Sequence, residues 1–193
     1  MNKKALMITA GIILALVGIF SYANANSFKD QALENKQEPE TVIVHTTSAL
    51  DLSDRNQLVG WADNVFVGKV VKKKGSKKLN TLPETQFAVE VKKNLKGELT
   101  GTIVVNQQGG YDEEEKKTYV IEHDKLLEEG KKYLFVTKHN KEQNFHTLVP
   151  EYGDLLIEND VKYNKLVKEF KTVSTKQVPF KIDPGPGPDT GNN

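Results

Sequence analysis

Short runs of apolar and β-branched residues recur along the middle of the chain and predict a set of β-strands. The clearest run is VFVGKVV at residues 65–71. In FAVEV at residues 87–91, Phe87, Val89 and Val91 share one face, as alternation in a half-buried strand requires. The same criteria predict further strands at residues 41–47, 102–107, 118–121, 133–137, 145–149 and 155–157.

Two polar segments between these strands predict hairpins. A lysine-rich loop separates residues 65–71 from residues 87–91, and the turn HNKEQN separates residues 133–137 from residues 145–149. His139 and His146 flank the second turn, so pairing of the two strands would place them side by side.

Helical spacing is confined to short segments. Leu58, Trp61 and Ala62 fall on one helical face, with Asp51 as the expected cap and an end near Asp63. Residues 124–129 (DKLLEE) resemble a single helical turn before a glycine.

Residues 159–172 leave two interpretations open. Asn159 and Asp160 form either a tight hairpin turn before a helix or the start of one continuous helix. The apolar spacing of Tyr163, Leu166 and Phe170 favours a helix from about Tyr163.

The two ends of the chain differ from this middle part. Lys3 and Lys4 precede an uncharged, mostly apolar stretch, and Ala23-Asn24-Ala25 follows it in an A-x-A pattern. Residues 1–25 therefore read as a signal peptide cleaved between Ala25 and Asn26, with an uncleaved membrane anchor as the alternative.

The remaining boundaries follow from composition. Residues 26–40 are polar and aperiodic and are interpreted as a linker, and residues 41–175 as the β-rich globular domain. Residues 176–193 are interpreted as a disordered tail rich in Pro and Gly. Many short strands with one or two short helices predict a mainly β (α+β) fold, either a small barrel or a sandwich.

Composition and charge narrow the chemistry. The chain has no cysteine among its 193 residues, which excludes disulfides, thiolate catalysis and Cys-ligated zinc. Its net charge is +1, and becomes −1 once Lys3 and Lys4 leave with the signal peptide. Such a balance argues against nucleic acid as a partner, because nucleic acid requires a strongly basic face.

Four strings carry a family resemblance: ADNVFVGKV, FAVEVKKNLKG, VVNQQGG and LLEEGKKYLFV. They resemble a set of uncharacterised exported proteins of Gram-positive bacteria, over about residues 41–160. A more distant similarity is to the netrin-like module of metalloprotease inhibitors. Between the barrel and the sandwich, the resemblance implies the barrel: a small OB-like antiparallel barrel with one or two short helices. It implies no protease inhibition, because those inhibitors chelate the protease metal through an N-terminal cysteine that this chain lacks.

Five lysines form one candidate binding site: Lys72, Lys73, Lys74, Lys77 and Lys78. Clustered ammonium groups attract polyanions, so an anionic cell-wall polymer or a membrane surface is an expected partner. Another envelope protein is the alternative partner. A solvated hairpin loop would show the same lysine pattern.

A second candidate site is Gln107, Gln108, Gly109, Gly110 and Tyr111. A strand ends there and presents amides and a phenol, which suits ligand binding on a loop. The competing interpretation is a turn that needs two glycines for its φ angles.

Metal and enzyme motifs are missing from the pattern. DEEE at residues 112–115 lacks the spacing of a calcium loop, and two histidines do not complete a zinc site. Motifs of serine hydrolases, zinc proteases and nucleotide-binding enzymes do not occur. No metal or cofactor is therefore expected.

The function expected from these observations is an exported binding or interaction module of the cell envelope without catalytic activity. The expected location is extracytoplasmic, either secreted or membrane-anchored if the leader is retained. Two alternatives remain: a small hydrolase acting on cell-wall material, and a secreted enzyme inhibitor.

Overall fold

The computed structural model describes residues 39–45, 52–79 and 81–176. The predicted signal peptide with its Ala25–Asn26 cleavage site lies outside the described residues, as do nearly all of the predicted linker and tail. Among the helices that are described, none is long and apolar enough to cross a membrane.

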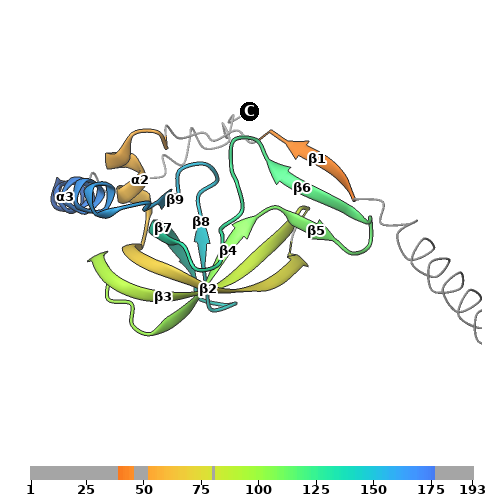
Figure 1. The fold of residues 1–193 in the computed structure, drawn as a ribbon, viewed down its shortest axis with the longest axis horizontal. Helices are drawn as coiled ribbons and strands as arrows, with labels where there is room; N and C mark the ends of the chain where they lie inside the picture. The colour runs from red at the N-terminus through yellow and green to blue at the C-terminus, as the bar shows by residue number, and fades with distance from the viewer. Residues whose placement is uncertain (1–38, 46–51, 80, 177–193) are drawn as a thin grey trace, which may run out of the picture. The chain divides into compact units, whose positions relative to one another are not determined.

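Five strands form the barrel at the centre of the fold (Figure 1). They are β2 (Asn64–Lys78), β3 (Pro83–Lys96), β4 (Thr102–Gln108), β7 (Lys132–Asn140) and β8 (Phe145–Leu148). Their spatial order is β2-β3-β4-β8-β7, and β7 pairs again with β2. All pairings are antiparallel except β4 with β8, which is parallel over two residue pairs. This is the strand order of an OB-type Greek-key barrel, so the predicted fold class is confirmed.

The inside of the barrel is filled by alternate residues of these strands. Phe87 and Val89 of β3 pack there against Phe66 of β2 and Phe135 of β7, and the Phe66 and Phe135 rings stack with centroids 5.0 Å apart. Gly68 is needed at this point, because a Cβ there would lie 2.6 Å from Val89 Cγ1.

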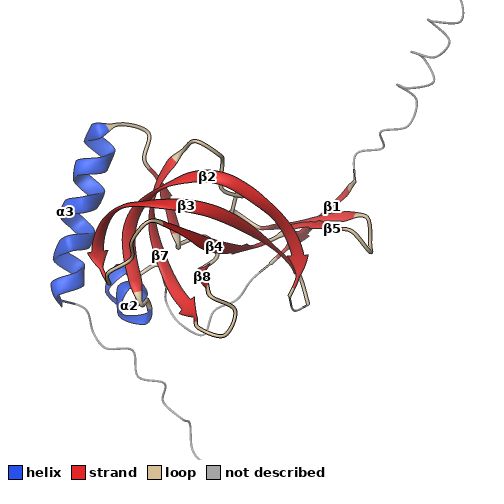
Figure 2. Cartoon of the chain, turned by 90° about the horizontal axis from the view of Figure 1, so that it is seen from below, coloured by secondary structure: helices blue, strands red, loops and turns tan. Residues whose placement is uncertain are grey.

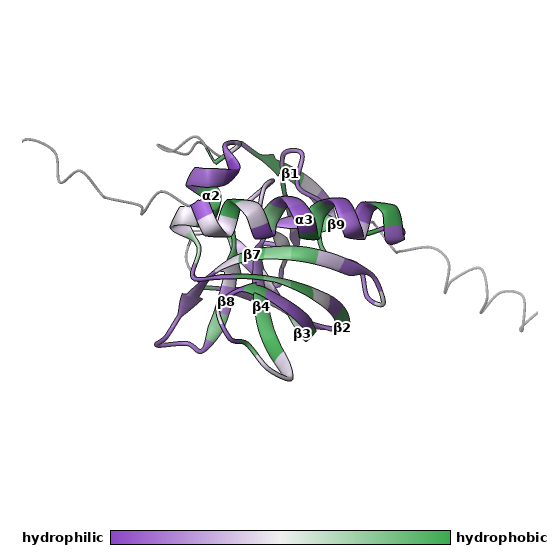
Figure 3. Ribbon diagram, turned by 90° about the vertical axis from the view of Figure 1, so that its left-hand side faces the viewer, coloured by the Kyte–Doolittle hydropathy of each residue, from purple (hydrophilic) through white to green (hydrophobic). Residues whose placement is uncertain are grey.

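Two helices, α2 (Arg55–Trp61) and α3 (Asp160–Lys176), lie beside one end of the barrel (Figure 3). Leu58 and Val59 of α2 and Leu166 and Phe170 of α3 belong to one buried cluster with residues of β2 and β7. Their amphipathic faces thus close the core at this end.

Both helix starts differ from the prediction. Asp54, not Asp51, caps α2, since its carboxylate accepts a hydrogen bond from the Asn56 N–H at 2.8 Å. At α3, Asn159 Oδ1 accepts from the Lys162 N–H at 2.9 Å and the helix begins at Asp160. The hairpin alternative for residues 159–160 is therefore wrong, because the asparagine caps a helix start.

A second, three-stranded sheet stands next to the barrel (Figure 2). It consists of β1 (Glu40–Val44), β6 (Lys117–Ile121) and β5 (Gly110–Asp112), in the order β1-β6-β5. β1 runs parallel to β6, and β5 runs antiparallel to it. The last strand, β9 (Asp154–Leu156), pairs with the beginning of β7.

The structure corrects one predicted loop and one predicted helical turn. The lysine-rich segment is not a loop, because β2 continues through it and pairs with β3 as far as Lys78. Residues 124–129 do not form a helical turn, although Gly130 has the positive φ expected after one. Side-chain bonds from Gln107 hold that segment in an irregular form instead.

Candidate functional site

The outer half of β2 carries the predicted lysines on a paired strand rather than on a loop. Lys72, Lys73, Lys74 and Lys77 are all exposed. The register with β3 shifts between Val70 and Lys72 and again between Lys73 and Gly75. Such bulges increase the local twist and redirect side chains, so the lysines do not follow a simple alternation.

A hollow of about 250 Å³ lies where the end of β2 meets β3, β4 and the β7–β8 turn. We call it the lysine groove; its lining residues are Lys74, Lys77, Leu79, Gln86, Val104, Gln143, Asn144 and Phe145. In barrel terms it lies on the end of the first strand, on the second and third strands, and on the loops after the first and the fourth strands. This is the face with which OB-folds bind oligonucleotides and oligosaccharides.

Hydroxyl contacts tie the lysine-bearing part of β2 to its neighbours. Ser76 Oγ and Thr85 Oγ1 lie 3.0 Å apart, and Thr85 Oγ1 donates to the Gly109 carbonyl at 2.7 Å. Thr85 is fully buried. Because buried hydroxyls with partners hold strands in one register, Lys74 and Lys77 are presented from a defined backbone.

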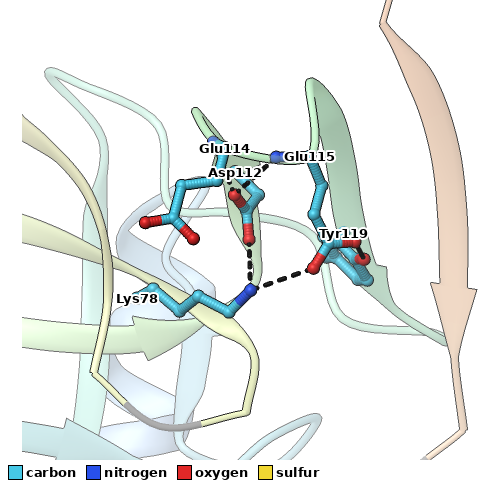
Figure 4. A network of polar contacts seen from close by, with 5 residues as sticks. All are labelled: Lys78, Asp112, Glu114, Glu115 and Tyr119. Atoms are coloured by element: carbon cyan, nitrogen blue, oxygen red, sulfur yellow. Dashed lines mark hydrogen bonds and ion pairs between the residues drawn. The ribbon is translucent and has the colours of Figure 1, made fainter.

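Lys78 is bound in an ionic network and does not line the groove (Figure 4). Its Nζ lies 3.1 Å from Asp112 Oδ2 and 2.9 Å from Glu115 Oε1. The hydrogen bond to Glu115, followed by the one to Asp112, raises the pKa of Lys78 above its ordinary value. Lys78 therefore joins β2 to the β5–β6 turn, and its charge is already balanced.

The acidic turn 112–115 is ordered by the same network (Figure 4). Asp112 Oδ1 accepts from the N–H groups of Glu114 and Glu115 at 2.8 and 3.0 Å. The backbone bond from Glu115 and the bond from Lys78 lower the pKa of Asp112. Tyr119 donates its O–H to Glu115, which lowers the pKa of that carboxyl. Asp112 and Glu115 thus stabilise the turn, and both share Lys78 as a partner.

The β7–β8 turn forms the opposite wall of the groove. Asn140 Oδ1 accepts from the Gln143 N–H at 3.0 Å, and Asn144 adopts a φ of 52°. Asparagine tolerates this left-handed conformation better than most residues. Phe145 is buried, so the turn is anchored in the core beside the amides of Gln143 and Asn144.

The predicted site at residues 107–111 is placed differently from the lysines. Gln107 is 1% exposed; its Nε2 donates to Asp124 Oδ1 and to the Lys125 carbonyl, and its Oε1 accepts from the Leu127 N–H. Gly109 and Gly110 are buried, with φ of 97° and 133°. The stretch links β4 to β5 with its glycines in positive φ, and Gln108 and Tyr111 are half-buried.

His139 and His146 pair across the β7–β8 hairpin as the sequence predicts. Their rings stack with centroids 4.5 Å apart and planes 9° from parallel. Burial, and then the neighbouring His139, lower the pKa of His146 to about 4. In the part of the chain that the structure describes, no group of three or more His, Asp or Glu side chains is arranged to hold a metal ion.

Of the eight residues that line the groove, sequence reasoning named only Lys74 and Lys77 as site residues. Gln86 and Val104 belong to strands that were predicted correctly, but only the barrel's closure places them next to the lysines. Gln143 and Asn144 belong to the predicted HNKEQN turn. The available signal was the OB-type barrel that the family resemblance implied, since that fold predicts which two loops lie at the binding face.

Comparisons with known proteins identify no family for the chain. No family model matches the chain, and no curated protein matches it. Among solved structures, the chain is similar to one in the crystal structure of yeast Stn1 and Ten1. The TM-score is 0.36 at 10% identity, over 78% of this chain and 80% of that chain.

The prediction that excluded nucleic acid as a partner is wrong. It relied on the charge of the whole chain, which is near zero. A total charge does not report where charges lie, and Lys74 and Lys77 line a groove on the face that OB-folds use for oligonucleotides. The net charge of the chain therefore does not exclude nucleic acid as a partner.

Proposed function

We propose that this chain is a non-catalytic binding module that holds a phosphodiester-linked polyanion in the lysine groove. The observation that carries the proposal is the position of Lys74 and Lys77 in a polar hollow on the barrel face. Two ammonium groups on a defined strand pair supply the charge, because each neutralises one phosphate and releases its counterions.

The other groove residues suit a chain-like ligand. Gln86, Gln143 and Asn144 offer amide donors and acceptors for hydroxyl or phosphate oxygens. Val104 and Leu79 provide apolar surface for the linking carbons. A volume of about 250 Å³ matches one or two repeat units of such a polymer rather than a folded partner.

Phosphodiester chains occur both in cell-wall teichoic acids and in nucleic acids, and the test separates these two sources. Fluorescence anisotropy is measured with the full-length protein, using labelled poly(glycerol phosphate) and single-stranded DNA and RNA of matched charge. The double variant K74E/K77E is compared with K72E/K73E, which changes the net charge equally outside the groove. We expect the groove variant to lose roughly a hundredfold in affinity and the control roughly threefold.

Equal losses in the two variants would show that binding follows net charge only, and the groove proposal would then be abandoned. Preference for poly(glycerol phosphate) supports a role in the cell envelope. Preference for either oligonucleotide keeps the groove and replaces the envelope polymer by nucleic acid as its ligand.

The envelope location is part of the proposal and is tested separately. The leader pattern at residues 1–25 supports it. Expression in a Gram-positive host, followed by N-terminal sequencing of the protein in the medium and the wall fraction, should give a chain that begins at Asn26. A full-length protein found in the cytoplasm would contradict export and leave the groove proposal standing.

The two alternative functions have direct assays. A cell-wall hydrolase should clear peptidoglycan suspensions, and a secreted inhibitor should form a stoichiometric complex with an extracellular enzyme. We expect no hydrolysis in the lysine groove, because its residues comprise amides, lysines and apolar groups without a carboxylate.

A further inference from the structure

A second hollow, also of about 250 Å³, lies between residues 123–128, the start of β7 and β9. It shares no lining residue with the lysine groove. Four carboxylates line it: Asp124, Glu128, Glu151 and Asp154. We call it the acidic pocket.

Asp124 is the most deeply buried of the four carboxylates. It is only 8% exposed, and its Oδ1 accepts a hydrogen bond from Gln107 Nε2 at 3.0 Å. Its Oδ2 is buried and has no hydrogen-bond partner among the described residues. Buried carboxylate oxygens are normally paired, so this oxygen marks the place where a ligand's donor is missing.

Asp154 lies near enough to Asp124 for the two carboxylates to repel each other. Burial, and then the Asp124 charge, raise the pKa of Asp154 to about 7. Burial also raises the pKa of Asp124, while the nearby Glu151 backbone N–H and the hydrogen bond from Gln107 act in the opposite direction. Two carboxyl groups that resist ionising together gain most from a cation placed between them.

We propose that the acidic pocket binds an organic cation that carries a primary ammonium group on a short alkyl chain. The carboxylates accept from the three ammonium donors, and Asp124 Oδ2 gains the partner it lacks. Leu126 and Leu156 line the same pocket and provide apolar contact for the alkyl chain.

A metal ion fits this pocket less well than an organic cation. Calcium needs six to eight oxygens within about 2.6 Å, which demands converging carboxylates. The described residues contain no group of three or more acidic or histidine side chains arranged in that way. The volume and the leucine contacts instead match a ligand with several carbon atoms.

The pH dependence of binding involves every charged group that faces the pocket. Glu128 and Glu151 add negative charge, while His123 and Lys125 oppose a cation. Tyr133 also lines the pocket; its hydroxyl oxygen accepts from the Glu128 N–H, and burial raises its pKa. Comparison of the wild type with D154N isolates Asp154, because the other groups are the same in both proteins.

The test uses n-butylammonium, with 1-butanol as the neutral analogue of equal length. Amide chemical shifts of the full-length protein are followed by NMR during each titration at about pH 8. We expect saturable shifts at residues 123–128 and 154–156, and an affinity for butylammonium at least tenfold above that for butanol. D154N should remove most of this preference, whereas D160N, the same change on α3, should retain it.

Three results would overturn the proposal: equal affinities for the two probes, shifts elsewhere in the protein, or an unchanged preference in D154N. Tighter saturation by calcium chloride than by butylammonium would also overturn it in favour of a metal site. If D154N does not fold, H123N decides, because it removes the imidazole from the pocket: its preference for butylammonium must fall between about pH 8 and pH 5.5 as Asp154 takes up a proton. The groove variant K74E/K77E must bind butylammonium normally, so failure here is distinguishable from failure of the proposed function.

Discussion

The lysine groove and the acidic pocket are hollows of equal volume with opposite charge and different burial. In the groove, Lys74 and Lys77 are exposed and surrounded by neutral amides and apolar groups. In the acidic pocket, Asp124 is buried with an unpaired oxygen. Water stabilises the first set of charges in the free protein, but solvates the second set poorly.

This difference in burial predicts that substitutions in the two hollows will change stability by different amounts. Exposed charges destabilise a fold little, so the groove lysines can change with small effects on stability and larger effects on binding. Buried carboxylates reduce stability until a ligand compensates them, so changes in the acidic pocket should alter both quantities. The four predictions below test this contrast, from the largest expected effect to the smallest.

Gln107→Leu should destabilise the protein most, by about 4 kcal/mol, because it leaves the Leu127 N–H, the Lys125 carbonyl and Asp124 Oδ1 without partners. Urea denaturation measures the change. Gln108→Leu, at the half-buried neighbour, should lose less than about 1 kcal/mol. In the folded Gln107→Leu protein, affinity for polyanions should stay within about threefold, since Gln107 does not line the groove. A similar loss in both variants would contradict this role of Gln107.

Asp154→Asn should stabilise the protein at alkaline pH, by on the order of 3 kcal/mol, and have little effect at about pH 4. The pKa rises from 3.8 in the unfolded chain to about 7 in the fold. The folded state therefore binds the extra proton between these values, and stability falls as pH rises through about 7. Denaturation across pH measures the slope, with Asp160→Asn as the control. A pH-independent difference between Asp154→Asn and wild type would contradict the raised pKa.

Salt should weaken the two kinds of ligand unequally. With two lysines at phosphates, polyanion affinity should fall about twentyfold for each tenfold increase in salt. Butylammonium in the acidic pocket should lose about threefold over the same range, because its partners are partly buried and less screened. Anisotropy and NMR titrations at several salt concentrations give both slopes. Equal slopes would mean that the two sites do not differ in solvent exposure.

His146→Asn should make stability less sensitive to acid, by about 1 kcal/mol between pH 6.5 and pH 4. The pKa of His146 falls from 6.5 to about 4 on folding, so the unfolded chain takes up the proton first and stability falls as pH falls. His146 lies next to Phe145 of the groove wall but outside both hollows. Denaturation of His146→Asn and of the exposed His123→Asn at these pH values provides the comparison. The same acid slope in the wild type and His146→Asn would refute the assignment.

Sequence pattern was sufficient for the strands because alternation is a local property. Phe87 and Val89 face the core as predicted, and the hairpin that pairs His139 with His146 has the predicted turn. The pattern failed for β2 beyond Val71, where the strand was predicted to end. Its lysines carry no apolar signal, and only pairing with β3 keeps that part extended.

The candidate sites were predicted with mixed success for the same reason. Lysine clustering drew attention to residues 72–78, but the contacts that separate Lys78 from Lys74 and Lys77 come from β5 and the turn that follows it, far along the chain. The glycines at residues 109 and 110 looked like an open loop. The structure buries them between strands, where their positive φ is required.

By itself, the sequence determined that this is a mainly β chain with two helices, because hydrophobic periodicity and turn residues act over a few neighbours. The order of the strands in the barrel came from the tertiary structure. Only the tertiary structure decided which charged side chains lie together in a candidate site. Asp124 and Asp154 are 30 positions apart in a chain where neither stands out, and burial on the same wall creates their mutual repulsion. The repulsion between two carboxylates depends on their separation in space and on their burial, and the sequence pattern gives neither quantity.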